Sequence, residues 1–169
     1  MHLVDCAARE NDIVVASVFV NPVQFNNPND LAKYPRDLEG DASKLAAHHV
    51  DYIFAPSVDE MYPEEVTKTY VFGQVDKVME GKYRPGHFNG VAVVVHRLFN
   101  IVEPGNAYFG EKDFQQLAVI RKLAEQEHIP VNVIGCKTIR EPDGLAMSSR
   151  NQRLTPRERK EAPFILMPP

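Results

Sequence analysis

The stretch IVVASVFV, residues 13–20, decides the fold, because it is a nearly continuous run of β-branched and aromatic side chains. A run of this kind suits a strand that is buried on both faces, as the strands of parallel sheets are. Asn21 and Pro22 follow the run and stop the strand. The stretch therefore predicts a strand inside a mostly parallel sheet.

Helix and strand patterns alternate after this strand, beginning with Leu38, Ala42 and Leu45 at helical spacing. We expect helices at residues 38–48, 90–102 and 114–127, and strands at residues 52–55, 107–109 and 131–134. This order predicts an open, mostly parallel α/β sheet with right-handed crossovers. Ligands of such sheets bind beyond the carboxyl ends of the strands, so we expect the chemistry in the loops that follow the strands.

Composition excludes several classes of protein. The chain has 169 residues, of which 44% are hydrophobic and 25% charged, as expected for one globular domain. The net charge of −4 without long runs of like charge argues against a nucleic-acid surface. No stretch approaches the roughly 20 apolar residues of a membrane span, and the first residues do not resemble a signal peptide. Cys6 and Cys136 lie in no metal-ligand spacing, which predicts a reducing, cytoplasmic location.

Both ends of the chain have unusual patterns. Residues 3–7 already have a helical pattern, without a capping residue before them. Near the other end, residues 155–158 (TPRE) predict a helix start with Thr155 as N-cap and Glu158 at N3. Pro163 then interrupts that helix. We therefore expect a truncated or internal segment of a longer protein.

The first strand is followed by residues 21–25 (NPVQF), which carry the side-chain amides of Asn21 and Gln24. An amide can donate and accept at once, so it suits a small hydroxy acid that presents a hydroxyl and a carboxylate. A plain Asn-Pro turn is an equally good interpretation. Both interpretations stay open from these residues alone.

The third expected strand is followed by residues 110–113 (GEKD) and by the start of a helix. Lys112 lies beside that helix N-terminus, an arrangement that attracts phosphate oxygens. Asp113 and Gln116 also have the spacing of a capping box, which would be a structural role. We expect both features, with Asp113 capping the helix and Gln116 turned toward a ligand.

Two further segments carry charged or hydroxyl side chains. Ser148, Ser149 and Arg150 follow the last expected strand and could clamp a polyphosphate, although a surface loop rich in Ser and Arg is the commoner explanation. Arg84 and His87 lie among glycines and prolines. We interpret His87 as structural or solvated rather than catalytic.

Five motifs in one order resemble the pantothenate synthetase family. They are FVNPVQF at 19–25, YPRDLEGD at 34–41, RPGHFNGV at 84–91, FGEKDFQQL at 109–117 and DGLAMSSRN at 143–151. That family condenses pantoate with β-alanine, using ATP, through an enzyme-bound pantoyl adenylate, and releases AMP and pyrophosphate. The resemblance implies a Rossmann-like fold of the nucleotidyltransferase type, homodimers, and ATP with Mg²⁺.

The resemblance also implies roles for individual positions. Gln24 would bind pantoate and then β-alanine, with Gln116 as a second pantoate contact. The implied ATP-binding residues are Gly110, Glu111, Lys112, Asp113, Ile139, Met147, Ser148, Ser149 and Arg150. Of these, Lys112, Ser148 and Arg150 are the expected catalytic residues.

Supporting roles follow from the same resemblance. Asn21 would support the pantoate pocket, and Asp41 would be an outer ligand of Mg²⁺. Tyr34, Glu80 and Arg84 would line the site or the dimer-facing loops.

Three features of the family are missing from this sequence: a His-x-Gly-His motif, the first, central strand and a C-terminal domain. We therefore expect a partial ATP- and pantoate-binding domain at residues 1–162 and a non-family tail at residues 163–169. One hypothesis is a ligase fragment with little or no activity by itself. The alternative is a non-catalytic nucleotide- or pantoate-binding or dimerisation fragment. A different nucleotidyltransferase of similar fold is disfavoured by the paired glutamines Gln24 and Gln116.

Overall fold

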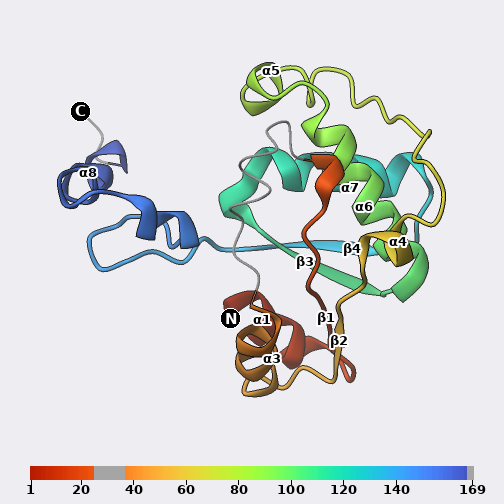
Figure 1. Cartoon of the computed structure of the whole chain (residues 1–169), viewed down its shortest axis with the longest axis horizontal. Helices are drawn as coiled ribbons and strands as arrows, with labels where there is room; N and C mark the ends of the chain where they lie inside the picture. The colour runs from red at the N-terminus through yellow and green to blue at the C-terminus, as the bar shows by residue number, and fades with distance from the viewer. Residues whose placement is uncertain (25–36, 167–169) are drawn as a thin grey trace.

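The alternation of helices and strands predicted from the sequence is confirmed in a computed structural model that describes residues 1–24 and 37–166 (Figure 1). Its helices are α1 (His2–Glu10), α3 (Leu38–Ala46), α4 (Val58–Met61), α5 (Glu80–Tyr83), α6 (His87–Val102), α7 (Phe114–Gln126) and α8 (Pro156–Glu161). Its strands are β1 (Val15–Ser17), β2 (Tyr52–Phe54), β3 (Asn106–Gly110) and β4 (Asn132–Cys136). Short 3-10 helices are η1 (Pro22–Gln24), η2 (Glu111–Asp113), η3 (Ser149–Arg153) and η4 (Ala162–Leu166).

The strands pair in parallel, as predicted, but in two separate sheets. β1 pairs with β2 in the register Val15 to Tyr52, and β3 pairs with β4 in the register Asn106 to Asn132. The long apolar run at residues 13–20 pairs only at Val15–Ser17. The fold is α/β as expected, whereas the expected single sheet is interrupted between β1 and β3 in the described part of the chain.

A cavity of about 690 Å³ lies where the two sheets are interrupted. Its walls come from α1, β1, α6 and β3, through Leu3, Val4, Ala7, Val14–Val18, Val95, Leu98, Phe99, Val102 and Asn106–Phe109. Val14 O accepts a hydrogen bond from Tyr52 N at 3.2 Å, and Val18 N donates to Phe54 O at 2.9 Å. Because pairing uses alternate residues, the backbone groups of Val15 and Ser17 point away from β2.

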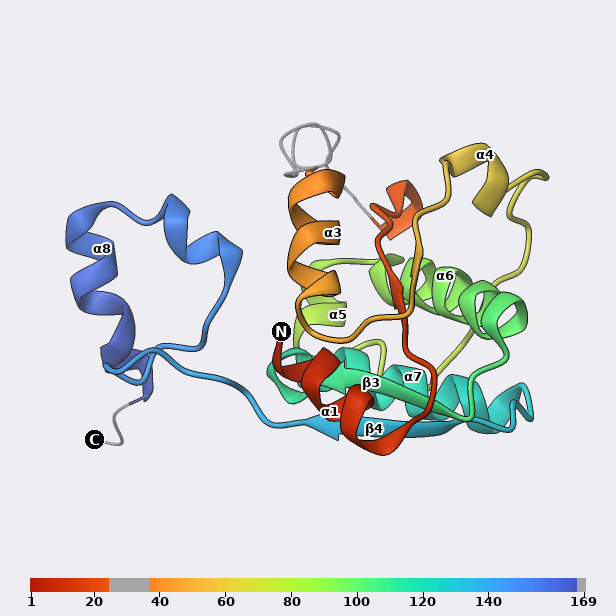
Figure 2. The ribbon, with the colours of Figure 1, turned by 90° about the horizontal axis from the view of Figure 1, so that it is seen from below.

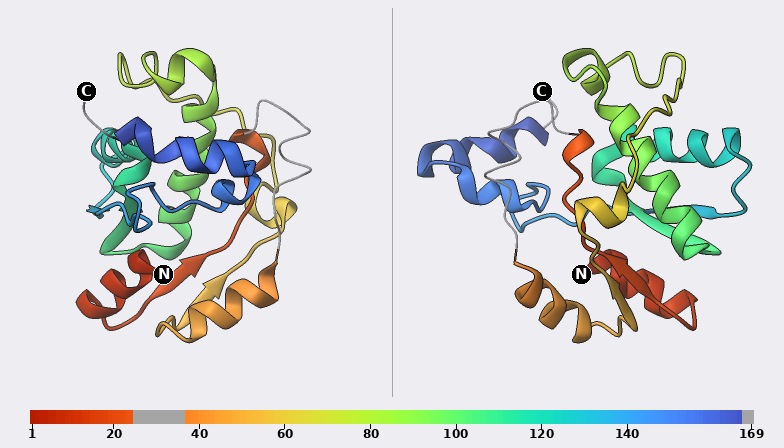
Figure 3. Two further views of the ribbon diagram at one scale, coloured as in Figure 1. Left: turned by 90° about the vertical axis from the view of Figure 1, so that its left-hand side faces the viewer. Right: turned by 45° about the vertical axis from the view of Figure 1, so that its right-hand side comes forward.

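The hydrophobic core lies between α6, α7 and the connection that precedes α5. Ala92 of α6 and Ile120 and Leu123 of α7 have no exposed surface, and neither do Met61 at the end of α4 and Phe72 of the connection. Burying one such large side chain contributes about 1.5–3 kcal/mol. Figure 3 shows α6 and α7 on one side of the β3–β4 pair and α1 on the other. The sheet with β3 is thus covered on both faces, as the sequence pattern predicts for parallel strands.

α1 is tied to β3 and β4 by polar groups. The Asn11 side chain donates to Tyr108 Oη at 2.8 Å, and Asn106 donates to Asn11 Oδ1 at 2.8 Å. Cys6 of α1 and Cys136 of β4 are neighbours here, although they are 130 positions apart in the sequence. Burial and a hydrogen bond with the Cys6 thiol raise the pKa of Cys136 to about 11. Sequence spacing alone could not bring these thiols together.

Residues 137–166 form a C-terminal arm that stands beside the α/β body (Figures 1 and 2). Within it, Arg140 and Ala146 form an antiparallel bridge, and Arg159 pairs with Asp143. The predicted capping box at residues 155–158 is confirmed, because the Thr155 and Glu158 side chains each accept the other's backbone N–H.

None of the helices in residues 1–24 and 37–166 has the length and apolar character of a membrane span.

Candidate functional site

The turn after β1 is held by Asn21, which is 2% exposed. Its Oδ1 accepts from Val23 N at 3.2 Å and from Tyr62 Oη at 2.9 Å. Its Nδ2 donates to Gly90 O at 3.0 Å and lies 3.4 Å from Gln24 Oε1. All four hydrogen-bonding positions of the amide are used. Asn21 therefore builds the turn itself, whereas the Gln24 side chain is only half-buried.

η1 lies directly against the start of α6. A Cβ on Gly90 would come within 2.7 Å of Val23 O and 2.8 Å of Gln24 Cα. Those separations are shorter than side-chain contacts allow, so only glycine lets the two backbones approach this closely. The position of Gln24 is thus set by the packing of η1 on α6.

His87 joins the same contact from the first turn of α6. It is 6% exposed, its Nδ1 lies 3.0 Å from Gln24 O, and its Nε2 lies 3.1 Å from Arg84 Nη1. Arg84 in turn forms an ion pair with Glu80. Burial is the main cause that lowers the pKa of His87, with the Arg84 charge as a lesser cause. Of the two roles predicted for His87, structural or solvated, its burial and its two hydrogen-bonding contacts favour the structural one.

The first turn of α7 is connected to this group through Gln115. Gln115 is 8% exposed; its Oε1 accepts from Glu80 N at 3.0 Å, and its Nε2 donates to Val75 O and Val78 O, each at 2.7 Å. Gln116, the predicted pantoate contact, is half-buried and makes no hydrogen bond with another described residue. Of the two neighbouring glutamines, one side chain is thus used by the fold and the other is left available.

The predicted phosphate side begins at η2 and is more exposed. Lys112 Nζ lies 2.9 Å from Asp113 Oδ1, and the side chains of Lys112 and Asp113 are 36% and 60% exposed. The prediction that Asp113 caps α7 is wrong: it occupies the N-cap position, but its side chain accepts no backbone N–H. Its carboxylate is turned toward the neighbouring cation instead. Gly110 has open space around it, since a Cβ there would meet nothing within 4 Å.

The other predicted ATP-binding residues lie on the C-terminal arm. Met147 N donates to Ile139 O at 2.9 Å, and both side chains are about half exposed. Ser148 Oγ accepts from Arg150 N at 3.2 Å, where it caps η3. In residues 1–24 and 37–166, none of Ile139, Met147, Ser148 and Arg150 forms a hydrogen bond or ion pair with η1, η2 or α7. The hydrogen bonds of these residues are thus made within the arm, whereas Lys112 bonds its neighbour Asp113.

Asp41, the predicted magnesium ligand, lies in the first turn of α3. Its carboxylate is 3.6 Å from Lys44 Nζ, and it lines the cavity between β1 and β3. Across the described residues, no three His, Cys, Asp or Glu side chains gather so as to hold a metal ion. A single carboxylate fits an Mg²⁺ ion held mostly by phosphates, and does not make a protein cage for one. Tyr34 lies outside the described residues.

Sequence reasoning missed three residues that hold this site. Tyr62 donates to Asn21 across 41 positions, and burial raises its pKa to about 12. Gln115 bonds Glu80, Val75 and Val78, whereas the sequence predicts a role only for its neighbour Gln116. Gly90 belongs to the motif at 84–91, so a glycine inside a predicted helix was the available signal.

Comparisons with known proteins identify the family to which the chain belongs. The family model described as pantoate-beta-alanine ligase matches residues 1–167. The pantothenate synthetase of Bacteroides fragilis is 54% identical over 160 residues, 95% of this chain and 57% of the relative. That of Porphyromonas gingivalis is 57% identical over 163 residues, 96% of this chain and 58% of the relative.

Solved structures show the same relationship. A crystal structure of pantothenate synthetase from Thermus thermophilus matches with a TM-score of 0.92 and 54% identity, over 96% of this chain and 59% of that chain. The Francisella tularensis pantoate-beta-alanine ligase, solved with beta-gamma ATP and beta-alanine, matches with a TM-score of 0.91 and 43% identity, over 96% and 63%. The chain thus spans about three fifths of the length of these relatives. By sequence and fold, it belongs to the pantoate-beta-alanine ligase family.

Proposed function

We propose that this chain supplies the pantoate- and ATP-binding surface for the ATP-dependent condensation of pantoate with β-alanine. One observation carries the proposal: the two turns that bear Gln24 and Gln116 are joined by the hydrogen-bonded chain His87, Arg84, Glu80 and Gln115. The Gln116 side chain has no hydrogen-bonding partner among the described residues, and Gln24 uses only its Oε1, which accepts from Asn21 at 3.4 Å, so both amides keep groups that a ligand can bind. Family membership supports the same reaction, with pantoyl adenylate as the intermediate.

On the pantoate side, the Gln24 and Gln116 amides would bind the hydroxyl and carboxylate of pantoate, since each amide donates and accepts. Gln24 would later bind β-alanine. The fixed η1 turn supports this role, because holding a carboxylate in one orientation favours its attack on ATP. Residues 1–162 would form this binding domain and residues 163–169 a tail outside it.

On the phosphate side, Lys112, Ser148 and Arg150 would stabilise the charge that develops on the phosphate oxygens as pantoate attacks the α-phosphorus. Preorganised cations are most effective at such a site. Gly110, Glu111, Asp113, Ile139, Met147 and Ser149 would complete the ATP contacts. In the described residues, Lys112 pairs with Asp113 and Arg150 N is bonded to Ser148, so both cations would turn to the phosphates from separate elements.

Mg²⁺ would neutralise phosphate charge, with Asp41 as an outer ligand and the ATP phosphates as the main ones.

The homodimer, the cytoplasmic location and the absence of a nucleic-acid partner stay predictions from the sequence. The alternative function, a nucleotide- or pantoate-binding or dimerisation fragment without catalysis, is favoured by one feature. The hydrogen bonds that hold the pantoate side are formed without a ligand, whereas Lys112 and Arg150 have no hydrogen-bonding partner in common in the described residues.

Calorimetric titration separates these functions. We expect pantoate to bind the native chain, and Gln24→Ala to weaken that binding at least tenfold, while the exposed control Gln74→Ala leaves it unchanged. Mg-ATP is titrated separately, and pyrophosphate release is measured with pantoate, ATP and β-alanine together. Binding of pantoate without pyrophosphate release supports the non-catalytic alternative. Equal binding by the native chain and Gln24→Ala would contradict the proposed pocket.

A further inference from the structure

We infer that His87 is a positioning residue, which holds Gln24 in place for pantoate as a neutral imidazole that carries its proton on Nδ1. The inference rests on the proposed function in one respect, the role of Gln24 in binding pantoate. The contact between His87 and Gln24 is a feature of the structure and does not depend on that role. His87 bonds the backbone carbonyl of Gln24 and not its side-chain amide. It acts on the backbone of η1, which carries that amide.

The neighbours of His87 determine which ring nitrogen carries the proton. Arg84 Nη1 lies 3.1 Å from His87 Nε2, and a guanidinium can only donate. Nε2 must therefore accept, which leaves the proton on Nδ1. Nδ1 then donates to Gln24 O, 3.0 Å away. Glu80 holds Arg84 from its other side by an ion pair, so the donor to Nε2 is itself held in place.

Backbone geometry gives the imidazole little freedom. Gly86, at φ +80, makes the turn that starts α6 with His87 as its first residue. The His87 ring packs on Phe88 with ring centres 5.0 Å apart, and its 6% exposure keeps water away from the bond to Gln24. If the Nδ1 donor were lost, the half-buried Gln24 carbonyl would lose its partner from the buried His87 side. η1 would then have to move, and the Gln24 side chain with it.

The charged groups that face His87 act in opposite directions on its protonation. Arg84, at the end of α5, disfavours the protonated ring, whereas Glu80 of α5 and Asp113 of η2 favour it. Burial has the largest effect, and the pKa of His87 is lowered. A second ring proton would point from Nε2 at the Arg84 guanidinium, which places two cations and two donors against each other. Protonation would therefore displace Arg84 and break the chain that leads from Gln24 to Glu80.

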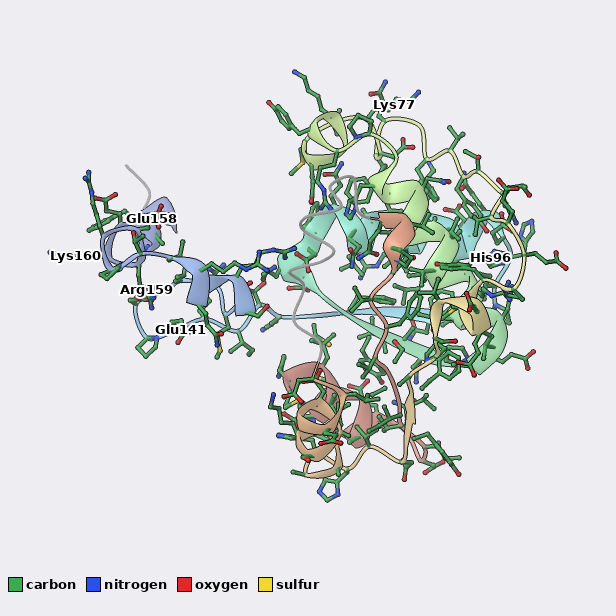
Figure 4. All side chains as sticks on the ribbon, in the orientation of Figure 1. Lys77, His96, Glu141, Glu158, Arg159 and Lys160 are labelled. Atoms are coloured by element: carbon green, nitrogen blue, oxygen red, sulfur yellow. The ribbon has the colours of Figure 1, made fainter. Side chains whose placement is uncertain are left out.

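Two substitutions separate the role of the Nδ1 donor from that of the ring. The amide nitrogen of Asn lies near the place of Nδ1, and that of Gln lies near the place of Nε2. We therefore expect His87→Asn to bind pantoate within about threefold of the native chain, and His87→Gln to bind at least tenfold more weakly, as for one lost buried hydrogen bond. The control is His96→Gln, a half-buried histidine of α6 that bonds Tyr70 instead; it is labelled in Figure 4.

The experiment combines calorimetry with ¹⁵N NMR of the full native chain. Imidazole ¹⁵N shifts of the Nδ1–H tautomer, together with retained affinity in His87→Asn, support the inference. The Nε2–H tautomer, or equal affinity losses in the two His87 variants, would overturn it. If His87→Gln does not fold, the tautomer and His87→Asn still decide the question.

Failure of the proposed function gives a different result. If the native chain does not bind pantoate, the side-chain amide resonance of Gln24 reports the position of η1 instead. We expect that resonance to shift in His87→Gln and to stay in place in His87→Asn and His96→Gln. An unmoved resonance in His87→Gln would reject the positioning role independently of any ligand.

Discussion

The two halves of the candidate site differ in how far the protein builds them before a ligand arrives. On the pantoate side, Asn21 and His87 are 2% and 6% exposed, and their hydrogen bonds connect the turn at η1 with α6 and with Tyr62. On the phosphate side, Lys112 and Asp113 have side chains 36% and 60% exposed and bond each other. Buried hydrogen bonds cost about 1–3 kcal/mol when one partner is lost, whereas exposed ion pairs contribute little. The pantoate side is therefore rigid, and the phosphate side can rearrange.

This difference suits the chemistry proposed for the chain. A small hydroxy acid gives few contacts, so its binding depends on groups that are already oriented. A nucleotide polyphosphate has high charge and can draw Lys112 and Arg150 toward it from separate places. Substitutions on the two sides should thus have effects of unequal size on folding.

The largest effect is expected at the contact between η1 and α6. Gly90→Ala places a Cβ 2.7 Å from Val23 O, and overpacking of this kind costs about 1–3 kcal/mol. We expect a lower free energy of unfolding in urea and loss of pantoate binding. The control is Gly105→Ala, where a Cβ would meet nothing within 4 Å. Equal stability of the two variants would show that η1 is not rigidly held.

A smaller effect is expected when Tyr62 loses its hydroxyl. Tyr62→Phe leaves Asn21 Oδ1 with one donor, Val23 N, and should lower the free energy of unfolding by about 1 kcal/mol. Tyr52→Phe, at an exposed tyrosine, is the matched control. Because burial raises the pKa of Tyr62 to about 12, its absorbance titration should lie above the ordinary tyrosine value of about 10. Titration of Tyr62 at that ordinary value would contradict its burial.

Acid should weaken the pantoate side through His87. Its pKa is lowered from 6.5 in the folded chain, mainly by burial, so the unfolded chain binds this proton first as pH falls. The stability that neutral His87 contributes is therefore present above about pH 6.5 and is lost below it. The pKa of His96 is lowered in the same direction, so we compare the native chain with His87→Asn. Urea unfolding from pH 7 to pH 5 should show a shallower loss in His87→Asn; equal slopes would count against this account.

The smallest effect on folding is expected at Lys112. Lys112→Ala removes one exposed ion pair, so the free energy of unfolding should change by no more than about 0.5 kcal/mol. Affinity for Mg-ATP should fall, and pantoate affinity should remain. In a full-length family enzyme, the same change should lower kcat, because Lys112 is assigned to charge in the transition state. A raised KM with unchanged kcat would make Lys112 a binding residue only.

Some features of the site could be read from residue order, and others could not. The amides after the first strand and the cation after the third were found because parallel strands place their carboxyl ends at one edge. The role of Asp113 was predicted wrongly, because its neighbour Lys112 competes for the same carboxylate and spacing does not say which contact forms. Tyr62 could not be found, since its partner Asn21 lies 41 positions away.

The sequence by itself determined the alternation of helices and strands, the capping box at Thr155 and the identity of the glutamines and cations, because these depend on local patterns of side chains. Only the tertiary structure decided that β1 and β3 belong to separate sheets, that Gln115 is bound while Gln116 is free of described partners, and that His87 reaches Gln24. The physical reason is that hydrogen bonds and close packing between distant segments depend on the distances between their atoms. The order of residues along the chain does not contain those distances.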